Sequence, residues 1–278
     1  MVRVAGRVSG LAEAFARGRD EHRPLLVGYL PAGFPSVAGG IEAMTTMVEA
    51  GVDIVEVGFP YSDPVMDGPT IQAAADQALR GGVRTGDVLR TVEAVAATGA
   101  PTLIMTYWNP VVRHGVDRFA ADLAAAGGAG LITPDLIPEE ADGWPAASDA
   151  HGLDRVFLVS PSSTDLRIAA AAAASRGFLY ATSVMGVTGA REQTSSRAPD
   201  LVARIRAATD MPVGVGLGVK NGEQAAEVGS FADAVIVGSA FVRCLLDAPD
   251  PASGLAALRD LTADLADGVR RAARPARS

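Results

Sequence analysis

Short apolar runs alternate with longer alanine-rich or amphipathic segments from one end of the chain to the other. Near-continuous apolar runs, each followed by a segment of helical composition, indicate a parallel sheet covered by helices. Several of the helical segments end in glycine just before the next apolar run, as helix C-termini commonly do. The expected strands are residues 25–30, 53–58, 101–107, 130–134, 155–160, 178–183, 212–218 and 234–239.

Eight strands alternating with helices predict a (β/α)8 TIM barrel of the α/β class, with residues 6–18 as an extra N-terminal helix across its bottom. The 278 residues, 49% of them hydrophobic, suffice for one such domain over residues 1–278. An open doubly wound sheet is the alternative fold, but the glycine fingerprint after the first strand is missing. Residues from about 270 to 278 are expected to form a disordered basic tail.

Composition narrows the function classes. The net charge of −8 disfavours a nucleic-acid or anionic-membrane partner, either of which would select a basic surface. No segment approaches the ~20 apolar residues of a membrane span, and the first 20 residues contain no continuous apolar segment of signal-peptide length, so a cytoplasmic protein is expected.

Cys244 has no second thiol and the three histidines lack ligand spacing, so no metal site is expected. Lys220, the only lysine, lies in a glycine-rich loop, which disfavours Schiff-base chemistry.

Glycine-rich loops follow the last three expected strands. Gly218 follows the seventh strand, Gly238 and Ser239 follow the eighth, and residues 186–189 follow the sixth. Loops after the last two strands of a barrel commonly hold phosphate through backbone N–H groups and helix N-termini. Ser239 is expected to cap the helix that begins there. Ordinary glycine turns are the alternative interpretation.

Three carboxylates are unusual in their placement. Glu56 interrupts the apolar run 53–58, on the strand face opposite its valine neighbours, so it is expected to point into the barrel. Asp63 and Asp67 follow in a proline-rich loop. Desolvation would raise the pKa of Glu56 toward neutrality, while Asp67 would stay anionic. The structural alternatives are a paired buried acid for Glu56 and turn or cap roles for Asp63 and Asp67.

The segment 56–72, EVGFPYSDPVMDGPTIQ, closely resembles the signature of the tryptophan synthase alpha chain family. The segments 134–140, 185–191, 216–219 and 237–242 follow in the family's order, so the resemblance covers nearly the whole chain. It implies a barrel enzyme of L-tryptophan biosynthesis, a lyase that cleaves indole-3-glycerol phosphate by a retro-aldol step into indole and glyceraldehyde 3-phosphate.

The resemblance also implies roles for individual residues. Glu56 would be the general acid and base, Asp67 would accept the indole N–H, and Tyr180 would lie beside the glutamate. The remaining implied positions are Gly189, Gly218, Gly238 and Ser239 for the phosphate, and Tyr29, Met105, Leu217 and Ile236 for the indole slot.

A partner is implied as well. Members of the family dock onto a beta chain that carries pyridoxal phosphate, commonly as an alpha2-beta2 tetramer, and this chain itself would need no cofactor. Asp63 in the loop 60–68 and Thr188 in the loop 187–199 are expected at that interface. The alternatives are a stand-alone lyase, a non-catalytic activating subunit, and another phosphate-binding barrel enzyme.

Three positions depart from the family's usual pattern. Phe34 stands where an aspartate is frequent, Val184 where an arginine is frequent, and Leu217 where a phenylalanine is frequent. None of them is an expected proton-transfer group. They bear on how the loop after the sixth strand is anchored and on how the indole slot is packed.

Overall fold

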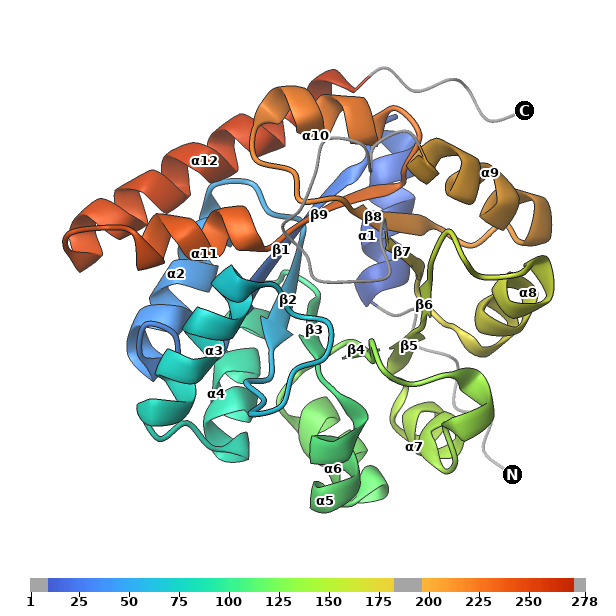
Figure 1. Ribbon diagram of the computed structural model, residues 1–278, viewed down its shortest axis with the longest axis horizontal. Coiled ribbons are helices and arrows are strands. Elements are labelled where there is room, and N and C mark those ends of the chain that lie inside the picture. The colour runs from blue at the N-terminus through green and yellow to red at the C-terminus, as the bar shows by residue number, and fades with distance from the viewer. Residues whose placement is uncertain (1–9, 183–196, 273–278) are drawn as a thin grey trace.

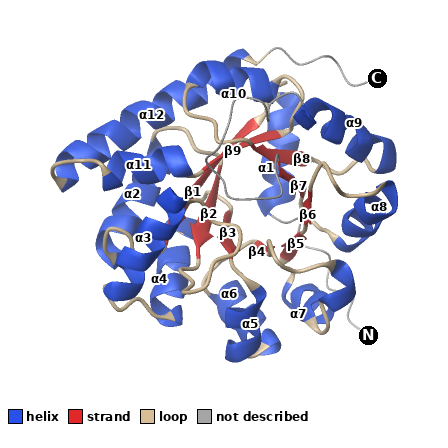
Figure 2. Cartoon of the chain, viewed as in Figure 1, coloured by secondary structure: helices blue, strands red, loops and turns tan. Residues whose placement is uncertain are grey.

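The computed structural model describes residues 10–182 and 197–272. Within these residues, one sheet of parallel strands runs in the order β5-β4-β3-β2-β1-β9-β8-β7-β6, and helices surround it (Figure 2). The strands are β1 Leu25–Pro31, β2 Ile54–Gly58, β3 Thr102–Met105, β4 Gly130–Ile132, β5 Asp154–Val156, β6 Leu158–Val159, β7 Leu179–Thr182, β8 Val213–Gly216 and β9 Ala234–Val237.

The helices form a ring outside the strands, except α1 (Figure 1). They are α1 Gly10–Asp20, α2 Val37–Glu49, α3 Pro69–Arg80, α4 Thr85–Ala96, α5 Trp108–His114, α6 Val116–Ala125, the 3-10 turn η1 Pro138–Glu140, α7 Trp144–His151, α8 Asp165–Ala174, α9 Ala198–Ala208, α10 Gly222–Gly229, α11 Ser239–Leu246 and α12 Pro251–Arg271. Because α12 continues to Arg271, the expected tail begins later than residue 270; residues 273–278 lie outside the described part.

The eight expected strands are all present, and the fifth is divided in two. β5 and β6 stand at the two ends of the strand order, yet only Phe157 separates them in the chain. β5 bonds to β4 while β6 bonds to β7, so this one segment joins both edges of the sheet. The apolar pattern cannot show the division, since alternation of inward and outward side chains continues through Phe157. The fold is the predicted TIM barrel, nearly closed, with this segment at the seam.

Two apolar clusters follow from strand alternation. The outer cluster lies between strands and helices and includes Val55, Val57 and Phe157. The inner cluster fills the lower part of the barrel, and α1 closes it from below with Leu11 and Phe15. The buried members of the inner cluster are Leu11, Ala14, Phe15, Leu25, Val27, Ile54, Leu103, Ile132, Val156, Phe178, Ala234 and Ile236. The helix expected at 6–18 is therefore confirmed from Gly10 onward, and it extends to Asp20.

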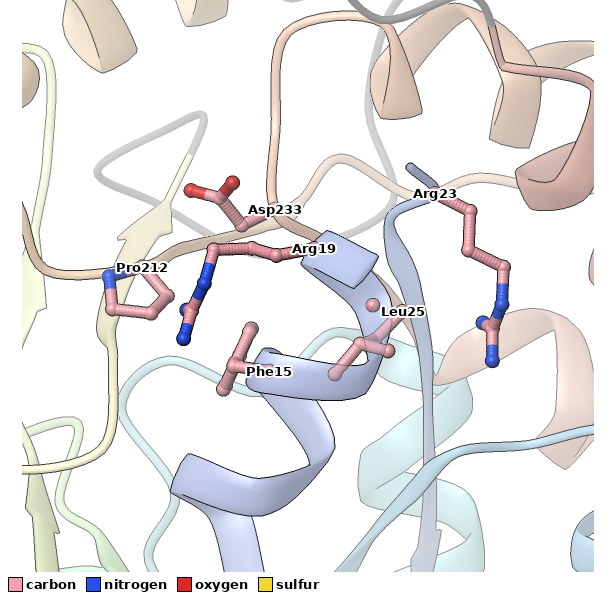
Figure 3. Close-up of a pocket in the computed structure, with 7 residues that line it drawn as sticks. Phe15, Arg19, Arg23, Leu25, Pro212 and Asp233 are labelled. Carbon is pink, nitrogen blue, oxygen red and sulfur yellow. The ribbon is translucent and has the colours of Figure 1, made fainter. Parts of the chain in front are cut away.

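A small cavity lies beside α1, at the amino-terminal ends of the strands (Figure 3). Its volume of about 10 Å³ is no more than one water molecule needs. The cavity is lined by Phe15, Gly18, Arg19, Arg23, Leu25, Pro212 and Asp233. Barrel active sites occupy the opposite, carboxyl-terminal face, so this cavity is a packing defect beneath the core rather than the functional site.

Candidate active site

Glu56 lies inside the barrel, and the described part of the chain offers its carboxyl group no hydrogen-bond partner. Ile54, on the same face of β2, belongs to the inner cluster, whereas Val55 and Val57 belong to the outer one, which confirms the expected orientation. The Glu56 side chain is 0% exposed, and within the described residues neither carboxylate oxygen has a hydrogen-bond partner. Burial raises the pKa of Glu56 to about 8. A structural acid would be paired, and residues 10–182 and 197–272 contain no hydrogen-bond partner for it.

Two tyrosines lie beside Glu56. Tyr29 is level with Glu56 on the neighbouring strand β1, and Tyr180 comes from β7 on another side of the barrel. Burial raises the pKa of both phenols well above the usual range, and the charge of Glu56 raises both further. Both hydroxyls therefore stay protonated and can donate hydrogen bonds. Both rings pack directly against glycine backbone. A Cβ atom on Gly58 would collide with the Tyr29 hydroxyl, and a Cβ atom on Gly216 would collide with the Tyr180 hydroxyl.

Asp67 lies in the loop between β2 and α3. The N-cap of α3 is Gly68, so the carboxylate of Asp67 does not cap that helix. Burial raises the pKa of Asp67, and a hydrogen bond with the Tyr107 hydroxyl lowers it by a smaller amount. The charge of Asp67 also raises the pKa of Tyr29. Tyr29 thus interacts electrostatically with both Glu56 and Asp67, so the two acids lie on the same side of the barrel, near this ring.

Tyr107 was not among the residues that sequence reasoning selected. The expected strand 101–107 included it, but β3 ends at Met105, and Tyr107 is the N-cap residue of α5. Its side chain is 5% exposed and its hydroxyl reaches the β2–α3 loop. The available signal was an aromatic residue directly after a strand on the catalytic face, in the segment TYWNP.

The expected phosphate residues occupy the carboxyl-terminal ends of β8 and β9. Gly218 has φ +68°, a conformation that favours glycine, and its main chain is exposed. Gly238 is the N-cap of α11, and Ser239 is the first helical residue, so the expectation that Ser239 caps this helix is wrong. The described residues provide no side-chain cap there, which leaves the first N–H groups of α11 available. Gly189 and Thr188 lie outside the described residues, as does Val184.

The expected indole-slot residues do not all lie together. Met105 and Tyr180 pack against the inner cluster, of which Ile236 is a member. Leu217 instead packs against the outer cluster, and Tyr29 contacts that cluster as well while facing Glu56 across the β1–β2 pair. Phe34 is 1% exposed and belongs to the outer cluster, so the side chain at this departure from the family pattern is buried in the core.

Asp63 lies on the outer side of the same loop. The residue is exposed, and it accepts a hydrogen bond from the Ser62 hydroxyl at 2.5 Å. Val65, two positions later, is 73% exposed. Asp67 thus interacts with Tyr29 and Tyr107, whereas Asp63 and Val65 of the same loop are exposed.

Among the residues that the structure describes, no group of three or more histidine, cysteine, aspartate or glutamate side chains is arranged to hold a metal ion. None of the helices described is long and apolar enough to cross a membrane.

Comparison with known proteins gives a consistent result. A family model described as tryptophan synthase alpha chain matches residues 15–270. The chain is 66% identical to the tryptophan synthase alpha chain of Salinispora tropica over 263 residues, 95% of this chain and 98% of that protein. The structure of Mycobacterium tuberculosis tryptophan synthase in space group F222 matches with a TM-score of 0.89 at 58% identity, over 95% of this chain and 99% of that chain. The chain therefore belongs to the tryptophan synthase alpha chain family, whose reaction is the lyase cleavage of indole-3-glycerol phosphate.

Proposed function

We propose that Glu56 is the general acid and base of this cleavage and that Asp67 is the anion that faces the indole nitrogen. The observation that carries the proposal is the unpaired, fully buried carboxyl group of Glu56, whose pKa is raised to about 8. At neutral pH this group holds its proton, yet it can release and recover it without a large change in free energy. That property is what proton transfer to carbon requires.

The reaction proceeds in two proton transfers through one residue. Protonated Glu56 first gives its proton to C3 of the indole, and a positive charge develops on the ring nitrogen. The resulting carboxylate then removes the proton of the hydroxyl on the carbon attached to C3. That carbon becomes the aldehyde of glyceraldehyde 3-phosphate, the carbon–carbon bond breaks, and its electrons restore the aromatic ring. Glu56 ends protonated, as it began.

Asp67 stabilises the intermediate charge in this scheme. Its carboxylate accepts the indole N–H, so that the charge on the nitrogen develops next to a fixed anion. The two acids can hold different protonation states because only Glu56 lacks any hydrogen-bond donor among the described residues, whereas Tyr107 donates to Asp67. Such a fixed anion stabilises developing charge most where water is excluded.

The phosphate of the substrate would bind between β8 and β9. The exposed main chain at Gly218 and the free N–H groups at the start of α11, beside Gly238 and Ser239, support this placement. Gly189 would contribute from the third loop. In the slot between phosphate and acids, Met105, Ile236 and Tyr180 would contact the indole ring, with Tyr29 and Leu217 at its margins.

We also propose that the chain acts in the cytoplasm with a beta chain that carries pyridoxal phosphate, in an alpha2-beta2 tetramer. The exposed Asp63 and Val65 support a docking role for the β2–α3 loop, since Asp63 has no part in the cleavage. Thr188 would lie on the second interface loop. Indole is apolar and leaves an open site readily, so transfer to a docked partner would retain it.

Turnover of indole-3-glycerol phosphate by the purified chain tests the proposal. Indole release would be measured for the wild type and for Glu56→Gln, each with and without the beta chain. We expect slow release by the wild type alone, acceleration by the beta chain, and a fall of roughly 10²-fold or more in the variant. Near-normal release by Glu56→Gln would contradict the catalytic assignment. Full activity of the wild type without a partner would indicate a stand-alone lyase instead.

A further inference from the structure

The hydroxyl of Tyr107 joins the β2–α3 loop to the segment that follows β3. It accepts a hydrogen bond from the backbone N–H of Met66, with 3.0 Å between the two heavy atoms. Asp67 is the next residue of the loop, and the interaction of its carboxylate with the Tyr107 hydroxyl lowers the pKa of Asp67. One phenol thus interacts with two consecutive residues of the loop. Tyr107 is 5% exposed, so the contact lies away from bulk water.

A second contact supports the first. The ring of Tyr61, near the start of the loop, lies 5.2 Å from the ring of Tyr107 at an interplanar angle of 33°. The Nδ2 of Asn109 donates to the Tyr61 hydroxyl at 3.1 Å. Two residues that follow β3 therefore bind the loop at both its beginning and its end.

The segment that carries Tyr107 is itself fixed. The backbone N–H of Trp108 donates to both carboxylate oxygens of Asp135, at 3.0 and 3.1 Å. Asp135 follows β4, so the connections after β2, β3 and β4 are linked in series. Tyr107 has little freedom to move, and neither has the group that it binds.

We propose that Tyr107 is a positioning residue for the cleavage, whose hydroxyl orients the carboxylate of Asp67 toward the indole nitrogen. This inference rests on the role proposed for Asp67. A carboxylate at the end of a loop samples several orientations unless a donor fixes it, and catalysis by a fixed charge depends on that orientation. Tyr107 makes no contact with the reacting atoms in this scheme, and it acts through Asp67 alone.

Removal of the Tyr107 hydroxyl should change the pKa of Asp67 in a predictable direction. Tyr107→Phe keeps the ring and its packing on Tyr61, but it removes the donor to Asp67 and the acceptor for the Met66 N–H. Without the donor the Asp67 anion is less stable, so its pKa rises further above the ordinary value. The rate should then fall at low pH sooner than in the wild type, because Asp67 becomes protonated at a higher pH.

The test compares the pH profiles of kcat for the wild type, Tyr107→Phe and the matched control Tyr61→Phe. We expect Tyr107→Phe to lower kcat roughly 10- to 30-fold at neutral pH, with little change in KM, and to move the acid limb to higher pH. Tyr61→Phe removes a hydroxyl group from the same pair of rings but leaves the partner of Asp67 in place. The acid limb of this variant should therefore coincide with that of the wild type. An unmoved acid limb in Tyr107→Phe would overturn the proposal even if the rate falls.

A double-mutant cycle separates positioning from general support of the loop. In an Asp67→Asn background, a residue that acts through the Asp67 carboxylate should have almost no further effect on kcat. We therefore expect Tyr107→Phe to change kcat less than about twofold in that background. Equal effects in both backgrounds would overturn the inference. Absence of indole release by the wild type would instead contradict the proposed function, so the two failures are distinguishable.

Discussion

The two halves of the barrel interior are built from the same strands but have opposite properties. In the lower half, Leu11 and Phe15 from α1 meet Leu25 and Phe178 in a closed apolar cluster. In the upper half, Glu56 lies among partly exposed tyrosines with no hydrogen-bond partner in the described residues. The halves meet at Phe178, whose ring lies 5.6 Å from Phe15 and 6.4 Å from Tyr180.

The lower half of the barrel interior stabilises the fold, whereas the upper half carries the reactive groups. Apolar burial in the lower half contributes free energy of folding without any chemistry. The unpaired acid in the upper half lowers the stability of the fold, because its ionised form is penalised by desolvation. Substitutions in the lower half should therefore change the free energy of unfolding, whereas substitutions in the upper half should change the rate of cleavage.

The largest effect is expected at Glu56. Glu56→Gln keeps the shape of the side chain but removes the exchangeable proton, so cleavage should fall roughly 10²-fold or more. The folded state holds a proton on Glu56 between its ordinary pKa and about 8, so the wild type loses stability as pH rises through this window. Glu56→Gln has no such loss and should be more stable than the wild type at pH 9, by roughly 3–5 kcal/mol. Denaturant unfolding at pH 5 and pH 9 measures this, and equal pH dependence in both proteins would contradict it.

The next largest effect is expected from Phe15→Ala in the lower half. Phe15 is 3% exposed, and its removal leaves a cavity between α1 and Phe178, which should cost about 3–5 kcal/mol of unfolding free energy. Below the melting temperature, kcat should stay within about twofold of the wild type, since Phe15 is far from the acids. Chemical denaturation and indole release on one preparation give both values. A large fall in kcat in fully folded protein would show that the halves are coupled through the Phe178 and Tyr180 rings.

The sequence predicted some features of the barrel interior correctly and missed others. Alternation along β2 placed Glu56 inside and Val55 and Val57 outside, because that rule depends only on neighbouring residues. It could not find Tyr107, whose role depends on a contact with a loop 41 positions earlier in the chain. It likewise missed the division of the fifth strand at Phe157, because pairing with two different strands leaves the apolar pattern unchanged. The prediction that Ser239 caps α11 was wrong by one residue, which is a typical error at a helix end.

The phosphate end of the upper half should respond through KM. Gly238→Asp adds a negative charge beside the free N–H groups of α11, and KM should rise roughly 10²-fold. The φ of Gly238 is −127°, outside the left-handed region, and the three atoms nearest to an added Cβ all belong to the Tyr29 side chain, the closest at 3.3 Å. Folding should therefore be little disturbed. Thermal melts with and without glycerol 3-phosphate check the site, and a wild-type melting temperature that ignores this ligand would contradict it.

The pH dependence of the wild type gives a further prediction about the upper half. The acid form of Glu56 begins the reaction, so kcat/KM should decline above a pH of about 8, by roughly tenfold per pH unit. Phe15→Ala should keep this basic limb unchanged, since Phe15 does not alter the environment of Glu56. A profile that stays flat to pH 10 would show that Glu56 does not deliver the proton.

The smallest effect is expected at the outer edge of the upper half, where Asp63 is exposed. Asp63→Ala removes an exposed charge whose hydrogen-bond partner within the described residues is the Ser62 hydroxyl. The slow rate of the isolated chain should stay nearly intact, whereas most of the acceleration by the beta chain should disappear. Such acceleration corresponds to a coupling free energy of about 1–3 kcal/mol, so the loss would be several-fold or more. Indole release titrated with the beta chain measures it, with Val65→Ala as a second variant on the same exposed surface. Undiminished acceleration of Asp63→Ala would leave Asp63 as a turn residue and would place the docking contact elsewhere on this face.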